Sequence, residues 1–444
     1  MVINWGLGVD STAFLVKMLE DPAAHGVDLA RTMVIHQITG SEWPNTYAHA
    51  EQYVLPLLRE SRVRLVQVAR ASRALEIAVM DDSRQPERIV RRGPWSLEED
   101  EYEANGTVPQ QGGIRLCSLH AKGEVGDALI AQEIGDQPFR QVMGFNADEV
   151  PRSLRDRGAS KNPLRQGLYP LIEWGWGRER CEAYLYERFG VRWEKSYCTF
   201  CCFPISMGAM AAHLDRMRAH PAIAGRVLRL EYTSVSLNPK AKLFGRHSLL
   251  EKFDPSRSAD RPVLAAFEEE LACPWALYHV RRILPVAKAD PARRGRALRS
   301  VERVDVGRAA VLGRRLQSVS ERHSVPVETD ERYGRVRAWV HRRGEGFPAV
   351  EELMVTAPFQ VRDKQVPHTS SGSGPRTVGS GRDAVWVPAR LTATTKSVIL
   401  ITRNKRQKRW AAEGTLSRGC RPRAATPTER PADHLHQLDS PAGA

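Results

Sequence analysis

The segment Val2-Ile-Asn-Trp-Gly-Leu-Gly-Val-Asp-Ser-Thr-Ala-Phe-Leu-Val-Lys-Met-Leu19 decides the predicted fold. A short apolar run comes first, a turn with two glycines follows at 6–12, and an amphipathic stretch comes last, which is the order strand, turn, helix. Glycine lets a backbone approach an anion closely, and the N–H groups and dipole of the following helix favour negative charge. Ser11 and Thr12 add hydroxyl donors. The segment predicts a phosphate-binding loop, and an ordinary strand–helix turn is the alternative.

Strand-like and helix-like segments alternate through the first half of the chain. Strands are predicted at 32–37, 62–68 and 141–145, and a helix at 47–60. This alternation is typical of an α/β fold, a twisted and mostly parallel sheet with helices on both faces. Ligands of open sheets of this kind bind beyond the carboxyl ends of the strands, where the turn at 6–12 would lie.

A second polar segment directly follows the second predicted strand. Residues 38–46 read Ile-Thr-Gly-Ser-Glu-Trp-Pro-Asn-Thr, and they would reach the same edge of the sheet as the first loop. Thr39, Gly40 and Glu42 are therefore candidate nucleotide-binding residues. The alternative is a capped turn that starts the next helix at Asn45 or Thr46.

A cationic segment lies further along the chain, at Arg115-Leu-Cys-Ser-Leu-His-Ala-Lys122. On a helix, its two ends recur on one face at spacings of three and four residues, so Arg115 and Lys122 would point the same way. Two cations on one helix face suit an anionic substrate. A solvated cationic face is the alternative.

A third polar segment, Gly144-Phe-Asn-Ala-Asp-Glu-Val-Pro-Arg152, ends a later predicted strand. Glu149 would hold a ribose or a metal ion, and Arg152 would meet a phosphate or sulfate with two hydrogen bonds. A simple ion pair between these two residues is the alternative.

Seven cysteines occur, at positions 117, 181, 198, 201, 202, 273 and 420. The odd number, and the three within five residues, do not match a secreted disulfide framework and indicate metal or redox chemistry. Cys198 and Cys201 form a tight chelate turn, with Cys202 adjacent, Cys117 as the remote ligand and His120 as its substitute. Zinc and an iron–sulfur cluster both suit such ligands. A redox Cys-x-x-Cys and a buried cluster without metal remain alternatives.

Taken in order, these segments resemble the phosphoadenosine phosphosulfate reductase-like family of the PP-loop ATP pyrophosphatase superfamily. Residues 6–11 fall on its Ser-Gly-Gly-x-Asp-Ser loop, although Gly6 replaces the serine and Leu7 replaces a glycine. The later segments are similar to the family's Thr-Gly-x-Glu-x-x-x-Thr, Arg-x-Cys-x-x-x-x-Lys and Gly-x-x-x-Asp-Glu-x-x-Arg patterns. The resemblance covers about residues 1–205.

The resemblance implies an adenine nucleotide alpha hydrolase-like fold that binds ATP, or an adenosine phosphosulfate-type nucleotide, with Mg²⁺ on the phosphate oxygens. The residues that would bind the nucleotide are Gly6, Gly8, Asp10, Ser11, Thr12, Thr39, Gly40, Glu42, Asp148 and Glu149. The residues expected to act in catalysis are Asp10, Arg115, Lys122 and Arg152. The expected metal ligands are Cys117, Cys198, Cys201 and Cys202.

Composition divides the chain into regions. After the nucleotide-binding domain at 1–205 we expect a helical subdomain at 206–290, a basic accessory region at 291–363, and a mostly disordered basic tail at 364–444, which is rich in Ser, Gly, Pro and Thr. From Val361 onward the chain has 15 Lys or Arg and 6 Asp or Glu, so +9 of the total net charge of +14 belongs to the end of the chain. With no long apolar run, the sequence favours a cytosolic protein without a membrane segment.

Three functions are compatible with these patterns. The leading one is an enzyme that adenylates an acceptor or delivers sulfur to it, with nucleic acid among the possible acceptors. A sulfonucleotide reductase is the alternative within enzymes, but Cys420 lacks the Glu and His that accompany the catalytic cysteine of that family. The third is a nucleic-acid-binding protein with a degenerate nucleotide site, which would use the basic run Arg403-Asn-Lys-Arg-Gln-Lys-Arg-Trp410.

Overall fold

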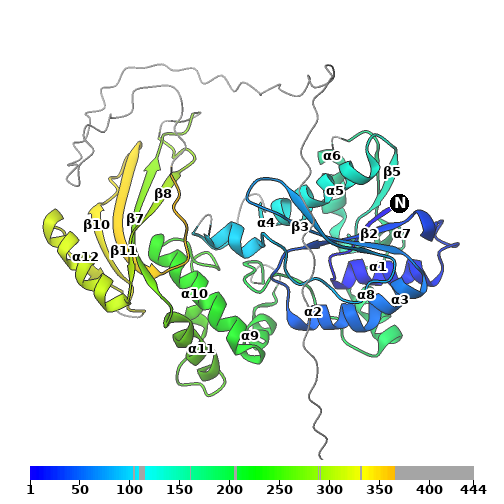
Figure 1. Cartoon of the computed structure of the whole chain (residues 1–444), viewed down its shortest axis with the longest axis horizontal. Coiled ribbons are helices and arrows are strands. Elements are labelled where there is room, and N and C mark those ends of the chain that lie inside the picture. Colours follow the sequence, from blue (N-terminus) through cyan, green and yellow to red (C-terminus); the bar gives the residue numbers. More distant parts are fainter. Residues whose placement is uncertain are drawn as a thin grey trace, which may run out of the picture. The chain divides into compact units, whose positions relative to one another are not determined.

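A computed structural model of the chain describes residues 1–103, 106–109, 116–160, 162–204, 208–288, 290, 292–330 and 333–365 (Figure 1). These residues belong to one unit of the chain, residues 1–368. The basic run at 403–410, Cys420 and the tail from residue 366 lie outside the described residues, as does Arg115.

A six-stranded, mostly parallel sheet forms the first half of this unit, in the order β4-β3-β2-β1-β5-β6. All neighbouring strands run parallel except β3 and β4, which are antiparallel. The strands are β1 (Val2–Asn4), β2 (Met33–Ile38), β3 (Arg64–Arg70), β4 (Ile77–Ser83), β5 (Phe139–Val142) and β6 (Arg165–Leu168). The strand order reverses between β1 and β5, because the chain builds outward from β1 in one direction and later from β5 in the other.

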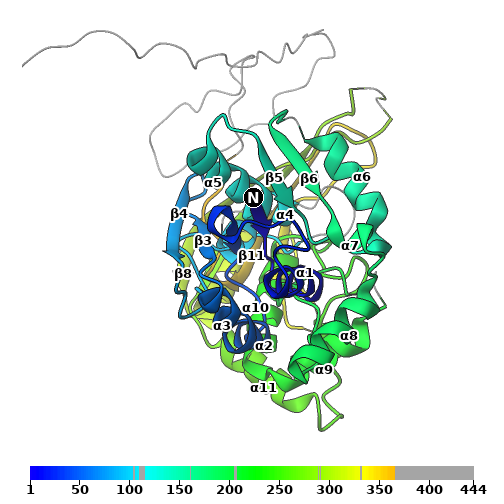
Figure 2. The same cartoon turned by 90° about the vertical axis from the view of Figure 1, so that its right-hand side faces the viewer.

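Helices cover both faces of this sheet. Ile3 and Val34 lie on one face and share a core with α1 (Val9–Glu20), α3 (Leu55–Glu60) and α8 (Arg178–Phe189). Val2 and Ile35 lie on the other face and pack on α5 (Glu124–Ile134) (Figure 2). Shorter helices occupy the connections: α2 (Pro44–His49), α4 (Leu116–Ser118), α6 (Val150–Ala159) and α7 (Pro170–Glu173). The predicted α/β architecture with a mostly parallel sheet is confirmed.

Three helices follow the cysteine segment: α9 (Met210–Ala219), α10 (Pro221–Leu237) and α11 (Arg261–Leu271). The last two cross closely at Gly225, where a Cβ atom would lie only 2.6 Å from the backbone of Ala266. Among the described helices, α10 included, none is long and apolar enough to cross a membrane.

A second, antiparallel sheet completes the unit, in the order β8-β7-β11-β10-β9. Its strands are β7 (Trp275–Leu284), β8 (Leu298–Gly307), β9 (Val327–Thr329), β10 (Val336–His341) and β11 (Ala349–Pro358). One face packs on α12 (Ala309–His323) through Leu312 and Leu316, and the other packs on Leu237 at the end of α10 (Figure 1).

This second sheet differs from the expected organisation. The region 206–290, expected to be a helical subdomain, ends in strand β7, and the basic accessory region 291–363 contains strand β8 as well as helix α12. Strand β8 lies at an edge of the sheet, and the adjacent charged residues Glu302 and Arg303 interrupt the alternation of polar and apolar residues that marks a strand.

Candidate functional site

The loop between β1 and α1 has the strand–turn–helix geometry that its sequence predicts. Side-chain hydrogen bonds hold this loop in place. Trp5 Nε1 donates to Thr12 Oγ1 in α1 (3.0 Å). From far along the chain, Trp193 Nε1 donates to the Leu7 carbonyl (3.2 Å) and Ser196 Oγ donates to the Gly6 carbonyl (3.2 Å). Gly8 precedes the helix and supplies no side-chain cap. The first N–H groups of α1 therefore have neither an intrahelical nor a capping partner, which is the arrangement that binds anions.

Leu7 adopts a left-handed backbone conformation, with φ of +59°, which favours glycine. This conformation costs a residue other than glycine about 1–2 kcal/mol. The Leu7 side chain is fully buried in the core that includes Phe14 and Trp193, and such burial contributes about 1.5–3 kcal/mol. Packing thus offsets the strain and keeps the loop in the shape that a glycine would allow.

The loop after β5 closes on the first turn of α1. A Cβ atom at Gly144 would lie 3.0 Å from Ser11 Cα, so only glycine permits this approach without a shift. Asn146 Nδ2 donates to Asp10 Oδ1 (3.2 Å), and Arg178 at the start of α8 pairs with Asp10 Oδ2 (2.6 Å). Burial raises the pKa of Asp10, whereas Arg178 and the Asn146 hydrogen bond lower it. Asp10 therefore joins three segments, and both of its oxygens are engaged.

Residues 148–152 lie beside this junction. Asp148 accepts a hydrogen bond from the backbone N–H of Arg178 (2.9 Å) and so caps α8. Glu149 and Arg152 form an ion pair (2.5 Å), and the Arg152 guanidinium also lies 4.6 Å from the Phe145 ring centroid. The simple ion pair considered from the sequence is present, and it leaves the guanidinium partly exposed beside the loop.

Two further cations join this group that the sequence did not single out, Arg178 and Lys195. Burial lowers the pKa of Lys195, and Arg178 and Arg152 lower it further, while Glu149 and Asp10 raise it. Lys195 lies shortly before the cysteine segment and Arg178 opens α8, but neither position marks a ligand by itself. Their closeness to Asp10 depends on the fold.

Lys122 lies beside the loop. Its Nζ lies 3.9 Å from the position that a Gly6 Cβ would occupy, and 3.7 Å from Glu42 Oε1. The segment 116–123 that carries it is helical. Lys122 thus lies next to two of the predicted nucleotide-binding residues, one from each of two loops.

The segment after β2 contains buried polar atoms without partners. Glu42 is almost fully buried, which raises its pKa, and Lys122 and Arg216 oppose this shift. Within the described part of the chain, Glu42 Oε2 has no hydrogen-bond partner, and the same holds for Ser41 Oγ and Trp43 Nε1. Buried unsatisfied polar atoms are costly and uncommon, so their concentration in one loop indicates a place for a ligand or water.

Thr39 and Gly40 begin this segment and fix its course. The Thr39 carbonyl accepts a hydrogen bond from the Leu97 N–H (2.9 Å). Gly40 has a φ of +80°, and a Cβ atom there would lie 2.7 Å from the Ser96 side chain, so a larger residue would both strain the turn and clash.

The structure brings Cys117 and the Cys-x-x-Cys turn close to Glu42. Burial raises the pKa of Cys198 well above its usual range, and Glu42, Cys201 and Cys117 raise it further. The Thr199 N–H donates to the Ser41 carbonyl (2.8 Å), which ties the turn to the loop after β2. Cys202 lies fully buried in an apolar core with Trp43 and Phe200. Among the described residues, no group of three or more His, Cys, Asp or Glu side chains is placed to hold a metal ion.

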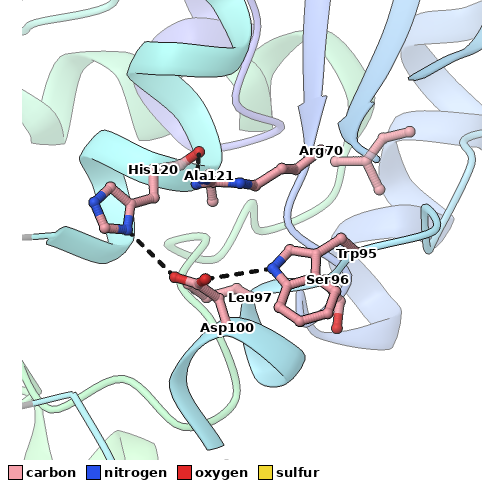
Figure 3. Close-up of a pocket in the computed structure, with 8 residues that line it drawn as sticks. Arg70, Trp95, Ser96, Leu97, Asp100, His120 and Ala121 are labelled. Atoms are coloured by element: carbon pink, nitrogen blue, oxygen red, sulfur yellow. Dashed lines mark hydrogen bonds and ion pairs between the residues drawn. The ribbon is translucent and has the colours of Figure 1, made fainter. Parts of the chain in front are cut away.

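A small pocket opens beyond the ends of β2 and β3 (Figure 3). Asp100 lies at its centre, where Oδ2 is 3.3 Å from His120 Nδ1 and Oδ1 accepts a hydrogen bond from Trp95 Nε1 (3.3 Å). The Asp100 carboxylate thus orients the His120 ring. Burial and the neighbouring Asp100 carboxylate raise the pKa of Glu101 to about 7.

The fold and these loops define an α/β protein with a candidate anion site at the reversal of its parallel sheet. Comparison with models of protein families, with curated proteins and with solved structures finds no match for the chain.

Proposed function

We propose that this chain is a PP-loop enzyme that binds ATP, or an adenylylsulfate-type nucleotide, and activates an acceptor by adenylation. One observation carries the proposal: the uncapped N-terminus of α1 lies at the point where the strand order reverses, and the loop after β5 closes on it at Ser11. Ligands of open α/β sheets bind at such a point. The family resemblance of residues 1–205 adds the nucleotide to this geometry, and an adenine nucleotide alpha hydrolase-like fold is part of the same proposal.

The phosphates would lie on the N–H groups at the start of α1, between Lys122 and the group formed by Arg152, Arg178 and Lys195. Fixed cations on both sides would stabilise the negative charge that develops on the phosphates in the transition state. Asp10 would position the loop through Arg178 and Asn146 rather than contact the phosphates itself.

In the proposed reaction an acceptor oxygen attacks the α-phosphorus of ATP. The new bond joins that oxygen to phosphorus, the bond to the bridging oxygen breaks, and pyrophosphate leaves with the electron pair. The proton of the acceptor passes to a base, and His120 Nε2 is the candidate because Asp100 orients the ring. Delivery of sulfur to the activated acceptor is a further proposed step, for which the sulfur source is not assigned.

Mg²⁺ would enter with the nucleotide and neutralise charge on its phosphate oxygens. Glu42 is the candidate protein ligand, because its Oε2 has no hydrogen-bond partner among the described residues. Lys122 Nζ lies near both Glu42 Oε1 and Gly6, so Glu42 is also close to the loop. A zinc ion or iron–sulfur cluster at Cys117, Cys198 and Cys201 remains a prediction that metal analysis tests.

A sulfonucleotide reductase is a weaker proposal for this chain. Such an enzyme needs a reactive thiolate, and Cys420, the cysteine expected to supply it, lacks the neighbouring Glu and His of that family. A nucleic-acid-binding protein with a degenerate site is favoured by Leu7, which stands where the related loop has glycine. One observation opposes this alternative: the backbone at Leu7 keeps the left-handed conformation of a glycine, although that conformation is unfavourable for leucine.

Titration calorimetry of the full chain with ATP and Mg²⁺, and separately with adenosine 5′-phosphosulfate, tests the proposal. We expect binding to the wild type, weaker binding to Asp10→Ala and Ser11→Ala, and unchanged binding to Ser318→Ala, which alters an exposed serine of α12. If the intact protein binds neither nucleotide, the proposed enzymatic function is wrong.

A further inference from the structure

Helix α6 turns its large apolar side chains to solvent, which is the reverse of an ordinary surface helix. Val150 and Leu154 lie one helical turn apart and are 41% and 61% exposed. Of the side chains of this helix that the structure describes, only that of Ser153 is buried. The helix lies beside β6, the edge strand of the six-stranded sheet (Figure 2). Its outer face is therefore not what attaches the helix to the protein.

Polar and cation–π contacts hold the inner face of α6 in place of an apolar stripe. Asp156 Oδ2 accepts hydrogen bonds from Tyr169 Oη (2.7 Å) and from Arg165 Nη2 (2.7 Å). The Arg157 guanidinium lies 4.7 Å from the Tyr169 ring centroid, and this ring stacks on that of Phe145, with 6.1 Å between the centroids. These contacts fix the helix without its two exposed apolar side chains, which remain available to a partner.

The exposed face is also cationic. Arg155 lies next to Leu154, and its Nε donates to a backbone carbonyl of the same helix (3.1 Å). Neither Arg155 nor Arg157 forms an ion pair with a residue that the structure describes. Asp156, the one carboxylate in the sequence of this helix, is already paired with Arg165 (2.7 Å). The apolar pair therefore has unpaired positive charge beside it.

Charge and apolar surface together select the kind of partner. Two copies of this helix would bring arginines against arginines, so a symmetric dimer through α6 is disfavoured. A nucleic acid strand would meet the arginines but leave Val150 and Leu154 in water. A helix of ten residues with two large apolar side chains gives a membrane little to bury. A protein surface with apolar side chains between carboxylates matches both parts of the face.

We propose that α6 is the docking site for an acidic amphipathic helix of a partner protein. The apolar side chains of that helix would cover Val150 and Leu154, and its carboxylates would pair with Arg155 and Arg157. Gly158 lies one turn beyond Leu154, and no atom lies within 4 Å of the position of a Cβ atom there, so a partner helix can approach closely. Helices dock on proteins through side chains spaced by three and four residues, as these are.

The docking face lies next to the candidate nucleotide site. Helix α6 begins at Val150, shortly after the loop that follows β5, and this loop closes on α1 at Ser11. A protein docked on α6 would therefore lie beside the loops that carry the proposed site. That this protein also carries the acceptor of adenylation rests on the proposed function.

Fluorescence anisotropy of a labelled probe peptide tests the docking face in the full chain at about 0.15 M salt. The probe has leucines spaced by three and four residues and glutamates elsewhere, and it is about 20 residues long because shorter isolated helices are marginal in water. One control peptide replaces the leucines by alanine, and another replaces the glutamates by lysine. We expect the probe to bind about tenfold more tightly than either control. Attraction of acidic peptides to the basic tail is common to the probe and the alanine peptide, so their difference reports on apolar contact.

Two variants locate the binding on α6. Leu154→Gln removes the most exposed apolar side chain of the face and should raise the Kd of the probe by about tenfold. Arg155→Gln should raise it by about two- to fivefold and reduce its salt dependence. The matched control, Val311→Gln/Arg314→Gln, changes an exposed valine and an exposed arginine of α12 and should leave the Kd unchanged. Thermal unfolding of each variant confirms that the chain is folded.

The inference is overturned if the probe does not bind the full chain, if Leu154→Gln binds it as the wild type does, or if the control variant loses as much affinity. It is also overturned if single-stranded DNA or phosphatidylserine vesicles bind the wild type more tightly than the probe and lose that affinity in Leu154→Gln. Calorimetry with ATP is run on the wild type and on Leu154→Gln. Probe binding without ATP binding would refute the proposed function alone, and ATP binding without probe binding would refute this inference alone.

Discussion

In the six-stranded sheet, charged side chains from distant segments meet beyond the strand ends, as Asp10 and Arg178 do, whereas in the five-stranded sheet they pair across neighbouring strands. His279 lies 2.6 Å from Glu352, and Arg282 lies 2.5 Å from Glu351, both pairs joining β7 to β11. Parallel strands all end at one edge, so their loops converge there. Antiparallel strands end alternately at two edges, so charges are paired within the ladder.

The candidate site belongs to the loops of the six-stranded sheet. The loop after β2 keeps buried polar atoms without partners among the described residues, at Ser41, Glu42 and Trp43. On the second sheet, Arg282 pairs with Glu351, although its Nε has no hydrogen-bond partner among the described residues. Polar groups that the chain does not satisfy by itself are available to a ligand. The five predictions below test the candidate site, both sheets and the tail.

The largest expected effect is on metal content. In protein purified without oxygen, Cys198→Ser should lose a bound zinc ion or iron–sulfur cluster together with stability, because metal binding is coupled to folding. Cys273→Ser, which changes the cysteine just before β7, should keep the metal. Metal and acid-labile sulfide analysis provide the measurement, and equal content in wild type, Cys198→Ser and Cys201→Ser would show that these cysteines hold no metal.

Removal of the cation beside the loop should weaken nucleotide binding strongly. A hydrogen bond to a charged group contributes about 1.5–3 kcal/mol, so Lys122→Met should raise the Kd for ATP by about 10- to 100-fold. Lys288→Met alters an exposed lysine after β7 and should change nothing. Calorimetry measures the Kd for ATP of both variants. Equal values would show that Lys122 does not contribute to nucleotide binding.

A single methyl group at the junction of the two loops should have a smaller effect. Gly144→Ala places a Cβ atom 3.0 Å from Ser11 Cα, so the first turn of α1 must shift. We expect a rise of about tenfold in the Kd for ATP, or about 1.4 kcal/mol. Gly307→Ala at the end of β8 meets only Leu312 at 3.9 Å and serves as the control. Unaltered binding by Gly144→Ala would mean that this junction does not shape the nucleotide site.

The pH dependence of stability should differ in sign between the two regions. Burial raises the pKa of Glu101 to about 7, so the folded chain holds the proton of this carboxyl group more tightly than the unfolded chain does. Protonated Glu101 therefore stabilises the fold at low pH, and this stabilisation is lost as the pH rises from about 4.5 through 7. The hydrogen bond from His279 lowers the pKa of Glu352, whose contribution is instead lost as pH falls.

Glu101→Gln should therefore flatten the decline in unfolding free energy between about pH 4.5 and 7, by about 3 kcal/mol at most. Glu352→Gln should remove stability mainly above about pH 4.5, where the wild-type carboxylate is charged. Chemical denaturation at a series of pH values measures both, and parallel curves for wild type and Glu101→Gln would refute the assignment.

The smallest effect is expected from removal of residues 366–444. The tail has the composition of a segment with little apolar surface to bury, so the truncated chain should unfold within about 2–4 °C of the full chain. The cut follows Gln365 because Lys364 is paired with Val301 in the structure. Thermal unfolding measures the stability of the truncated chain, and calorimetry measures its binding of ATP. Aggregation or loss of ATP binding would show that the tail is needed for the folded structure.

Much of the first region could be predicted from the sequence. Strands β2, β3 and β5, the helical segment at 44–60 and the turn before α1 follow local signals, namely apolar runs, period and glycine. The order of the polar segments along the chain also predicted that the loops after β1, β2 and β5 would lie at one edge. The same signals failed for β8, where the adjacent charged residues Glu302 and Arg303 interrupt the period of two. They failed also for β7, which lies in the region expected to be helical and pairs with β8 and β11.

By itself, then, the sequence determined the parallel architecture and the strand–turn–helix segment that carries the candidate loop, because both depend on periodicity or on the common direction of parallel strands. Only the tertiary structure decided that Asp10 is held by Arg178, and that Lys122 lies beside Gly6 and Glu42. The tertiary structure also decided the left-handed backbone of Leu7. Contacts between residues more than a hundred positions apart, and a strain offset by burial, depend on packing of the whole unit and leave no local pattern in the chain.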